Sequence, residues 1–129
     1  MTARIPVPTE DQEQAAFITW CDAVAARRWP SLAVAGVFGI LAIPNGGARS
    51  AITGARMRRT GTRAGVPDLL LPAPRHGCPG LWIEMKRVKG GVVSDQQGKW
   101  IEHLQRHGYR AVVVRGCAEA IKAVEEYLR

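Results

Sequence analysis

Two carboxylates and one lysine stand out because they lie on short apolar segments, where charge is costly. Asp68 begins the run of residues 68–71, and Glu84 and Lys86 share the run of residues 81–86. Two carboxylates close together repel each other and stay ionised together only if a cation lies between them. Hard oxygen ligands in this arrangement suit Mg²⁺ or Mn²⁺. The pattern therefore predicts a divalent-metal site.

The chemistry of such a site follows from the metal and the neighbouring lysine. A bound metal polarises a phosphate and lowers the pKa of a bound water. Lys86 would point at the same phosphate, where it positions the attacking water or stabilises the charge of the transition state. The three residues predict hydrolysis of a phosphodiester. Taken alone, the same pattern also fits a capped strand followed by a solvated polar strand face.

The sequence around these residues is strongly basic. The chain of 129 residues carries a net charge of +7, and Asp68 and Glu84 are the only acids in residues 23–94. Basic side chains hold phosphates while isolated carboxylates hold a cation, so this distribution favours a nucleic-acid partner. Charge alone does not separate DNA from RNA. The basic residues of the same stretch are Arg27, Arg28, Arg49, Arg56, Arg58, Arg59, Arg63, Arg75, Lys86, Arg87 and Lys89.

The two apolar runs are predicted to be strands, joined by the Pro- and Gly-rich loop 72–80. A hairpin across this loop would bring Asp68 close to Glu84. Because strand side chains alternate, Trp82, Glu84 and Lys86 share one face and the intervening apolar residues share the other.

The remaining elements surround this hairpin. Capping boxes begin two helices, one at Thr9 and one at Ser94, and Pro30 ends the first helix. The other expected elements are a strand over residues 37–43, a helix within 48–60, the body of the second capped helix over 94–107, a strand over 111–115 and a helix over 117–128.

The order α-β-α-β-β-α-β-α predicts one α/β domain over residues 1–129, with a mixed β-sheet flanked by helices. The strand-helix-strand segment 81–115 implies a parallel pair with a right-handed crossover.

Several further residues are candidates for DNA binding. The turn Asn45-Gly46-Gly47 allows the backbone close to a phosphate, although it also fits an ordinary turn that ends a strand. The arginine cluster is the expected phosphate grip, and its alternative is a solvated helical face. Trp20 and Trp100 are expected in the core, whereas Trp82 shares the face of Glu84. The cluster comprises Arg49, Arg56, Arg58, Arg59 and Arg63, and Arg87 is added to it as a DNA contact.

The sequence as a whole resembles the VRR-NUC group of PD-(D/E)xK nucleases, from about Glu10 to Leu128. No single matching segment is specific, but their combination is. The segments are EDQEQ (10–14), IPNGGAR (43–49), RAGVPD (63–68), IEMKR (83–87) and SDQQGKW (94–100).

The resemblance implies a restriction-endonuclease-like core and divalent-metal-dependent cleavage of DNA. It implies that Asp68 and Glu84 bind Mg²⁺ or Mn²⁺ with the main-chain carbonyl of Met85, and that Lys86 is catalytic. It also implies that an acid of the first helix joins the site. By position this acid is Glu10; Glu13, one helical turn on, is the rival, and it stands where the family often has an apolar residue.

Gln97 matches a glutamine that follows the ExK strand in this family. It is also the third helical residue of the Ser94 capping box, so it can simply bond the Ser94 N–H. Gln97 also lies on the helical stripe that contains Ile101 and Leu104, and this position directs its side chain inward, toward the sheet. Both readings are compatible with the sequence.

Stand-alone members of this group resemble phage and bacterial Holliday-junction resolvases, which act as two-fold dimers. The resemblance therefore implies a homodimer that cuts branched or junction DNA. The alternatives are a non-specific or flap-type DNA nuclease with the same site, an RNA-processing endonuclease and a DNA-binding module that does not cut. Intact Asp68, Glu84 and Lys86 argue against the last of these.

Other functional classes find no support in the sequence. No apolar run has the roughly 20 residues of a membrane span, and no secretory leader is recognised at the start. A phosphate-binding Gly-Lys-Ser loop is missing, so no nucleotide cofactor is expected. Cys21, Cys78 and Cys117 are expected to be reduced thiols in a cytoplasmic protein.

Overall fold

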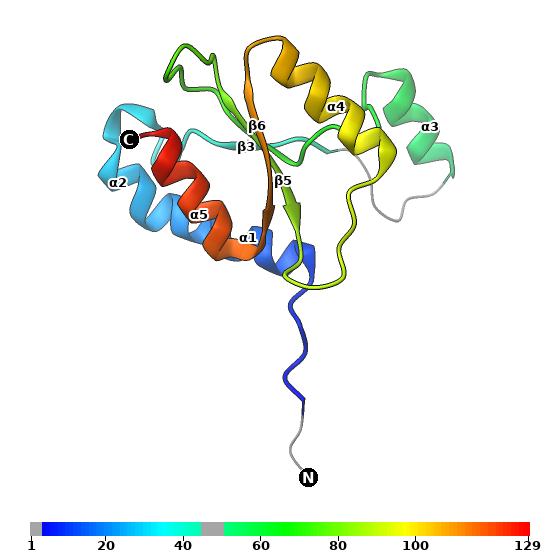
Figure 1. The fold of residues 1–129 in the computed structure, drawn as a ribbon, viewed down its shortest axis with the longest axis horizontal. Coiled ribbons are helices and arrows are strands. Elements are labelled where there is room, and N and C mark those ends of the chain that lie inside the picture. Colours follow the sequence, from blue (N-terminus) through cyan, green and yellow to red (C-terminus); the bar gives the residue numbers. More distant parts are fainter. Residues whose placement is uncertain (1–3, 45–50) are drawn as a thin grey trace.

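Four strands form the central sheet, in the order β3-β4-β5-β6 (Figure 1). The computed structural model describes residues 4–44 and 51–129. Strand β4 pairs with β3 and with β5 in antiparallel fashion, whereas β5 and β6 are parallel. The predicted hairpin and the predicted parallel pair are both confirmed, and the sheet is mixed. The strands are β3 (Leu41–Ala42), β4 (Leu69–Leu71), β5 (Leu81–Lys86) and β6 (Arg110–Arg115).

The helices begin and end where local signals place them. Helix α1 (Glu10–Trp20) starts after Thr9, and helix α4 (Asp95–Arg106) starts after Ser94; both capping boxes are complete. Helix α1 continues through a π-helical turn (Cys21–Ala25) into α2 (Ala26–Arg28) and stops before Pro30. The remaining helices are α3 (Ala51–Arg59) and α5 (Gly116–Tyr127).

Helices cover the sheet on two sides. In Figure 1, α1 and α5 lie together on one side, and α3 and α4 lie on the other. The core lies between the sheet and the first pair: Leu81, Ile83 and Met85 of β5 pack with Phe17 of α1 and Val124 of α5. This arrangement leaves the alternate face of β5 toward α4. The predicted α/β fold with a mixed sheet flanked by helices is thus confirmed.

The expectation of one strand over residues 37–43 is wrong. Strand β2 (Val37–Phe38) pairs with β1 (Ala33–Val34) in a separate two-stranded sheet, and only β3 joins the main sheet. Gly39 marks the break. Its N–H donates to the Leu32 carbonyl at 2.7 Å, and a Cβ there would lie 2.6 Å from the same oxygen. This close backbone contact, which only glycine allows, turns the chain between the two pairings.

The expectation that Trp100 belongs to the core is also wrong. Trp20 packs against the core cluster, but the cluster formed by the described residues does not include Trp100, which is half-buried on α4. An amphipathic helix at the side of a small sheet carries apolar residues that the sheet is not wide enough to cover. Separately, none of the helices that the structure describes is long and apolar enough to cross a membrane.

Candidate active site

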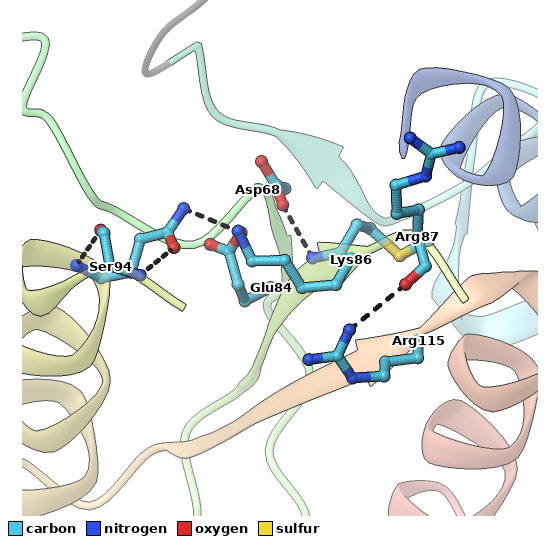
Figure 2. A network of polar contacts seen from close by, with 8 residues as sticks. Asp68, Glu84, Lys86, Arg87, Ser94 and Arg115 are labelled. Atoms are coloured by element: carbon cyan, nitrogen blue, oxygen red, sulfur yellow. Dashed lines mark hydrogen bonds and ion pairs between the residues drawn. The ribbon is translucent and has the colours of Figure 1, made fainter. Parts of the chain in front are cut away.

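The hairpin brings the two predicted carboxylates together. Leu69 pairs with Ile83, so Asp68, one residue before β4, lies beside Glu84. Asp68 is fixed by the strand opposite, because the Met85 N–H donates to its Oδ2 at 2.7 Å. One Asp68 oxygen thus orients the side chain toward β5. Figure 2 shows Asp68, Glu84 and Lys86 grouped at this position.

Glu84 and Lys86 are charged residues in a buried position. Their exposed fractions are 1% and 5%, and Lys86 Nζ lies 3.6 Å from Glu84 Oε2. Burial is the largest cause that raises the pKa of Glu84, and the neighbouring Asp68 charge and hydrogen bond add to it. Lys86 opposes the rise, yet the pKa of Glu84 still reaches about 8. The protein therefore tolerates an acid here at a cost, as at many functional sites.

Gln97 connects α4 to this group, and it does so while capping the helix. Its Oε1 accepts from the Ser94 N–H at 2.9 Å, and its Nε2 donates to Glu84 Oε2 at 3.3 Å. One amide thus makes both contacts that the sequence left open. The capping contact fixes the amide plane, which aims the N–H at the carboxylate.

The residues present fit a divalent cation. Glu84 Oε1 is buried and has no hydrogen-bond partner among the residues that the structure describes, although its other oxygen bonds Gln97 and pairs with Lys86. A buried carboxylate oxygen without a donor has an available lone pair, which a cation, a water or a proton shared with Asp68 can satisfy. The donors are carboxylate oxygens, which Mg²⁺ and Mn²⁺ prefer.

Among the residues that the structure describes, no third acid joins Asp68 and Glu84. Within residues 4–44 and 51–129 there is no group of three or more His, Cys, Asp or Glu side chains that could hold a metal ion. With two carboxylates, waters and a substrate phosphate would have to complete the coordination shell, which is common for Mg²⁺. The Met85 carbonyl remains a predicted ligand.

Glu13 is bound to another part of the fold. Its Oε1 accepts from the Cys117 N–H at 3.3 Å, so it caps the beginning of α5. A Cβ on Gly116, where φ is +87°, would lie 2.7 Å from Glu13 Oε2. This contact accounts for an acid where the family often has an apolar residue. Sequence reasoning missed it because the two partners lie on different helices.

Glu10, the favoured acid of the first helix, opens α1 in a half-buried position. The segment before it lies against the end of β5, since Arg87 Nη2 donates to the Val7 carbonyl at 3.0 Å. Its role in the site stays a prediction. The same bond gives the half-buried Arg87 a structural partner, and its contact with DNA likewise stays a prediction.

The predicted phosphate grip divides between described and undescribed residues. Arg56, Arg58, Arg59 and Arg63 are exposed, and none of the four forms an ion pair with another described residue. Exposed arginines without acidic neighbours fit phosphate contacts. The candidates Asn45, Gly46, Gly47 and Arg49 lie outside the described residues.

Comparison with known proteins decides the family. The sequence model of the VRR-NUC domain matches residues 40–118, which is more than half of the chain. The chain belongs to the VRR-NUC domain family. The matched segment contains Asp68, Glu84, Lys86 and Gln97, whereas Glu10 precedes it.

A solved structure of a VRR_NUC domain protein supports the same conclusion. It is 27% identical to this chain, superposes with a TM-score of 0.75, and the match covers 95% of this chain and 90% of that chain. The comparison with curated proteins gave no match. As a VRR-NUC domain, the chain is a nuclease of the restriction-endonuclease-like kind, which implies DNA as a substrate.

Proposed function

We propose that this VRR-NUC domain is a divalent-metal-dependent endodeoxyribonuclease that prefers branched DNA, including four-way Holliday junctions, and acts as a homodimer. The observation that carries the metal dependence is the buried Glu84 carboxylate, which lies beside Asp68 and leaves Oε1 without a donor among the described residues. Such a group lowers stability without a cation and binds one well.

Each residue then has a defined task. Asp68 and Glu84 hold the cation, with the Met85 carbonyl as the third protein ligand. When bound, Mg²⁺ or Mn²⁺ supplies Lewis-acid polarisation of the phosphate and a water of lowered pKa. Lys86 carries its positive charge beside Glu84 into the space that the scissile phosphate would enter, and stabilises the extra negative charge of the transition state. Gln97 fixes the orientation of Glu84.

The preference for junctions follows from symmetry. A four-way junction offers two equivalent strands, and a domain with one site cuts both within one binding event only as two copies. The resemblance to stand-alone junction resolvases supports this part of the proposal. The exposed arginines of α3 supply positive charge for a branched, densely charged substrate.

The test is cleavage of a labelled four-way junction beside linear duplex, flap, single-strand and matched RNA substrates. Each is incubated with Mg²⁺, with Mn²⁺ and with EDTA. Wild type is compared with Lys86→Ala and, as a matched control, with Lys89→Ala, which removes an exposed lysine nearby. Light scattering gives the mass of the free protein.

Paired, symmetric cuts in the junction that vanish with EDTA and in Lys86→Ala, but persist in Lys89→Ala, support the proposal. Metal-dependent cutting of flaps or linear DNA alone rejects the junction and keeps the metal-dependent nuclease. Cutting of RNA in preference to DNA means that the enzyme is an RNA-processing endonuclease. DNA binding without cleavage in either metal means that the chain is a binding module.

A further inference from the structure

The outer side of α4 carries aromatic side chains that neither the core nor the active site uses. The rings of Trp100 and His103 meet edge to face, with centroids 5.6 Å apart. His107 extends this stripe, with its ring 4.4 Å from that of His103 and its Nδ1 2.8 Å from the His103 carbonyl. Three rings thus form a continuous aromatic strip along one side of the helix.

A surface hollow lies beside this strip. Its volume is about 390 Å³, and its lining residues are Gln96, Lys99, Trp100, His103 and Arg106. Two of these carry positive charge, and none is acidic. Two acids are next in sequence to lining residues: Asp95 is not among the residues that line the hollow, and Glu102 lines a separate hollow with Gln105 and Arg106. An aromatic wall flanked by a lysine and an arginine is the combination that proteins use to bind single-stranded nucleic acid.

The hollow is joined to the active site through the first turn of α4. Gln96 lines the hollow, while the next residue, Gln97, reaches Glu84. Trp100 follows Gln97 by three residues, which is roughly 5 Å along a helix. The segment that leads into Asp68 also meets this place, because a Cβ on Gly65 would lie 2.7 Å from the Gln96 Cγ. The exposed Arg63 is two residues from that contact.

We infer that the outer face of α4 is a stacking platform for an unpaired base of the DNA strand next to the scissile phosphate, with Trp100 as its main ring. This inference rests on the proposed function for its substrate, and it adds a property to it: the enzyme selects DNA in which a base next to the cut site is unpaired or easily leaves its pair. A base in a continuous duplex is stacked on its neighbours and cannot stack on Trp100. A base in a flap can, and a base at a branch point can once its pair has opened.

The competing explanation is that Trp100 and His103 merely stabilise α4, since residues three apart on a helix are neighbours. Both explanations predict lower stability for Trp100→Ala. Only the platform predicts that removing the indole from the protein weakens DNA binding when the base is present and has no effect when the base is absent. A double-mutant cycle measures that coupling.

The cycle uses the full chain in EDTA, so that no strand is cut. Fluorescence anisotropy gives the Kd for a short labelled oligothymidine, for an abasic strand of the same length, and for a blunt duplex. The proteins are wild type, Trp100→Ala, Trp100→Leu, which keeps an apolar side chain without a ring, and Trp100→Phe, which keeps a ring. Circular dichroism melts show that each variant is folded at the temperature of the titration.

We expect Trp100→Ala and Trp100→Leu to weaken oligothymidine binding by about 10- to 100-fold and Trp100→Phe by clearly less. We expect all four proteins to bind the abasic strand and the duplex within about two-fold of one another, because those ligands contact only the cations. Equal binding of oligothymidine by wild type and Trp100→Ala overturns the platform. So does an equal loss for all three ligands, which would show that the tryptophan only supports the helix.

Cleavage is scored separately on the branched substrates. If wild type shows the base-dependent coupling but cuts no DNA, the platform stands and the proposed nuclease function fails. If wild type cuts in a metal-dependent way without the coupling, the nuclease stands and the platform is overturned.

Discussion

Strand β5 has two chemically opposite faces, and each contains almost completely buried residues. On one face Leu81, Ile83 and Met85 are completely buried and belong to the apolar core. On the other face Glu84 is 1% exposed and Lys86 is 5% exposed, yet Glu84 leaves an oxygen without a donor among the described residues. The same strand therefore separates residues that fold the protein from residues that the fold merely tolerates.

The difference shows that burial does not by itself identify the core. Burial of an apolar side chain lowers the free energy of the folded protein. Burial of a charge removes hydration that the neighbouring groups only partly replace. Asp68 and Glu84 add like charges to that cost. Residues kept at a cost to stability point to function, so substitutions on the two faces should have opposite effects.

The largest expected effect is on catalysis, from Glu84→Gln. The amide keeps the shape and can still accept from Gln97, but it loses the negative charge that binds the cation. We expect single-turnover cleavage to fall by about 1,000-fold or more, a loss of about 4 kcal/mol in transition-state stabilisation. If this variant cuts DNA within about ten-fold of the wild-type rate, the polar face of β5 does not serve catalysis.

The second largest effect is expected from a substitution on the core face, and it concerns stability. Ile83→Ala removes buried methyl and methylene groups from a completely buried site and leaves a cavity, so we expect the free energy of unfolding to fall by roughly 3 kcal/mol. Urea unfolding measures it, with Val113→Ala as the control, since that β6 residue is 37% exposed and should cost much less. Ile83→Ala should still cut DNA at a temperature where it is folded.

The sequence predicted the polar face of β5 because the determinants of this face are local. Alternation along residues 81–86, the Pro- and Gly-rich loop and the two capping boxes each act within a few residues, and the structure confirms all of them. The misses are long-range. The break at Gly39 depends on the Leu32 carbonyl, and Glu13 caps a helix 104 residues away in the sequence. Helical periodicity identified the apolar positions of α4, but it does not show how far the sheet extends beneath Trp100.

The third effect concerns stability and pH on the polar face. The pKa of Glu84 is raised to about 8 by burial and by Asp68, from an ordinary value of 4.5. Below about pH 4.5 the acid is neutral in both folded and unfolded protein and costs nothing, while above about pH 8 its ionised form destabilises the fold. In EDTA we therefore expect Glu84→Gln to melt at a higher temperature than wild type.

The gain should be close to zero near pH 4, grow through the interval between the two pKa values and level off at a few kcal/mol near pH 9. Thermal melts across this pH range measure it, and a few degrees in Tm correspond to each kcal/mol. Saturating Mg²⁺ should reverse the order by stabilising wild type alone. A gain that is constant with pH would mean that Glu84 does not titrate in this interval.

The smallest effect is expected from two substitutions that distinguish the contact of Gln97 with Ser94 from its contact with Glu84. Ser94→Ala removes the hydroxyl that accepts from the Gln97 N–H, but keeps the Ser94 backbone N–H that holds the Gln97 side chain. Gln97→Ala removes that contact and the donor to Glu84 as well. Each variant should lose roughly 0.5–1 kcal/mol of stability through the helix cap. Only Gln97→Ala should also slow cleavage, by about ten-fold, because Glu84 then loses the hydrogen bond that orients it. Equal cleavage by the two variants would mean that Gln97 only caps the helix and that α4 contributes no side chain to the polar face of β5.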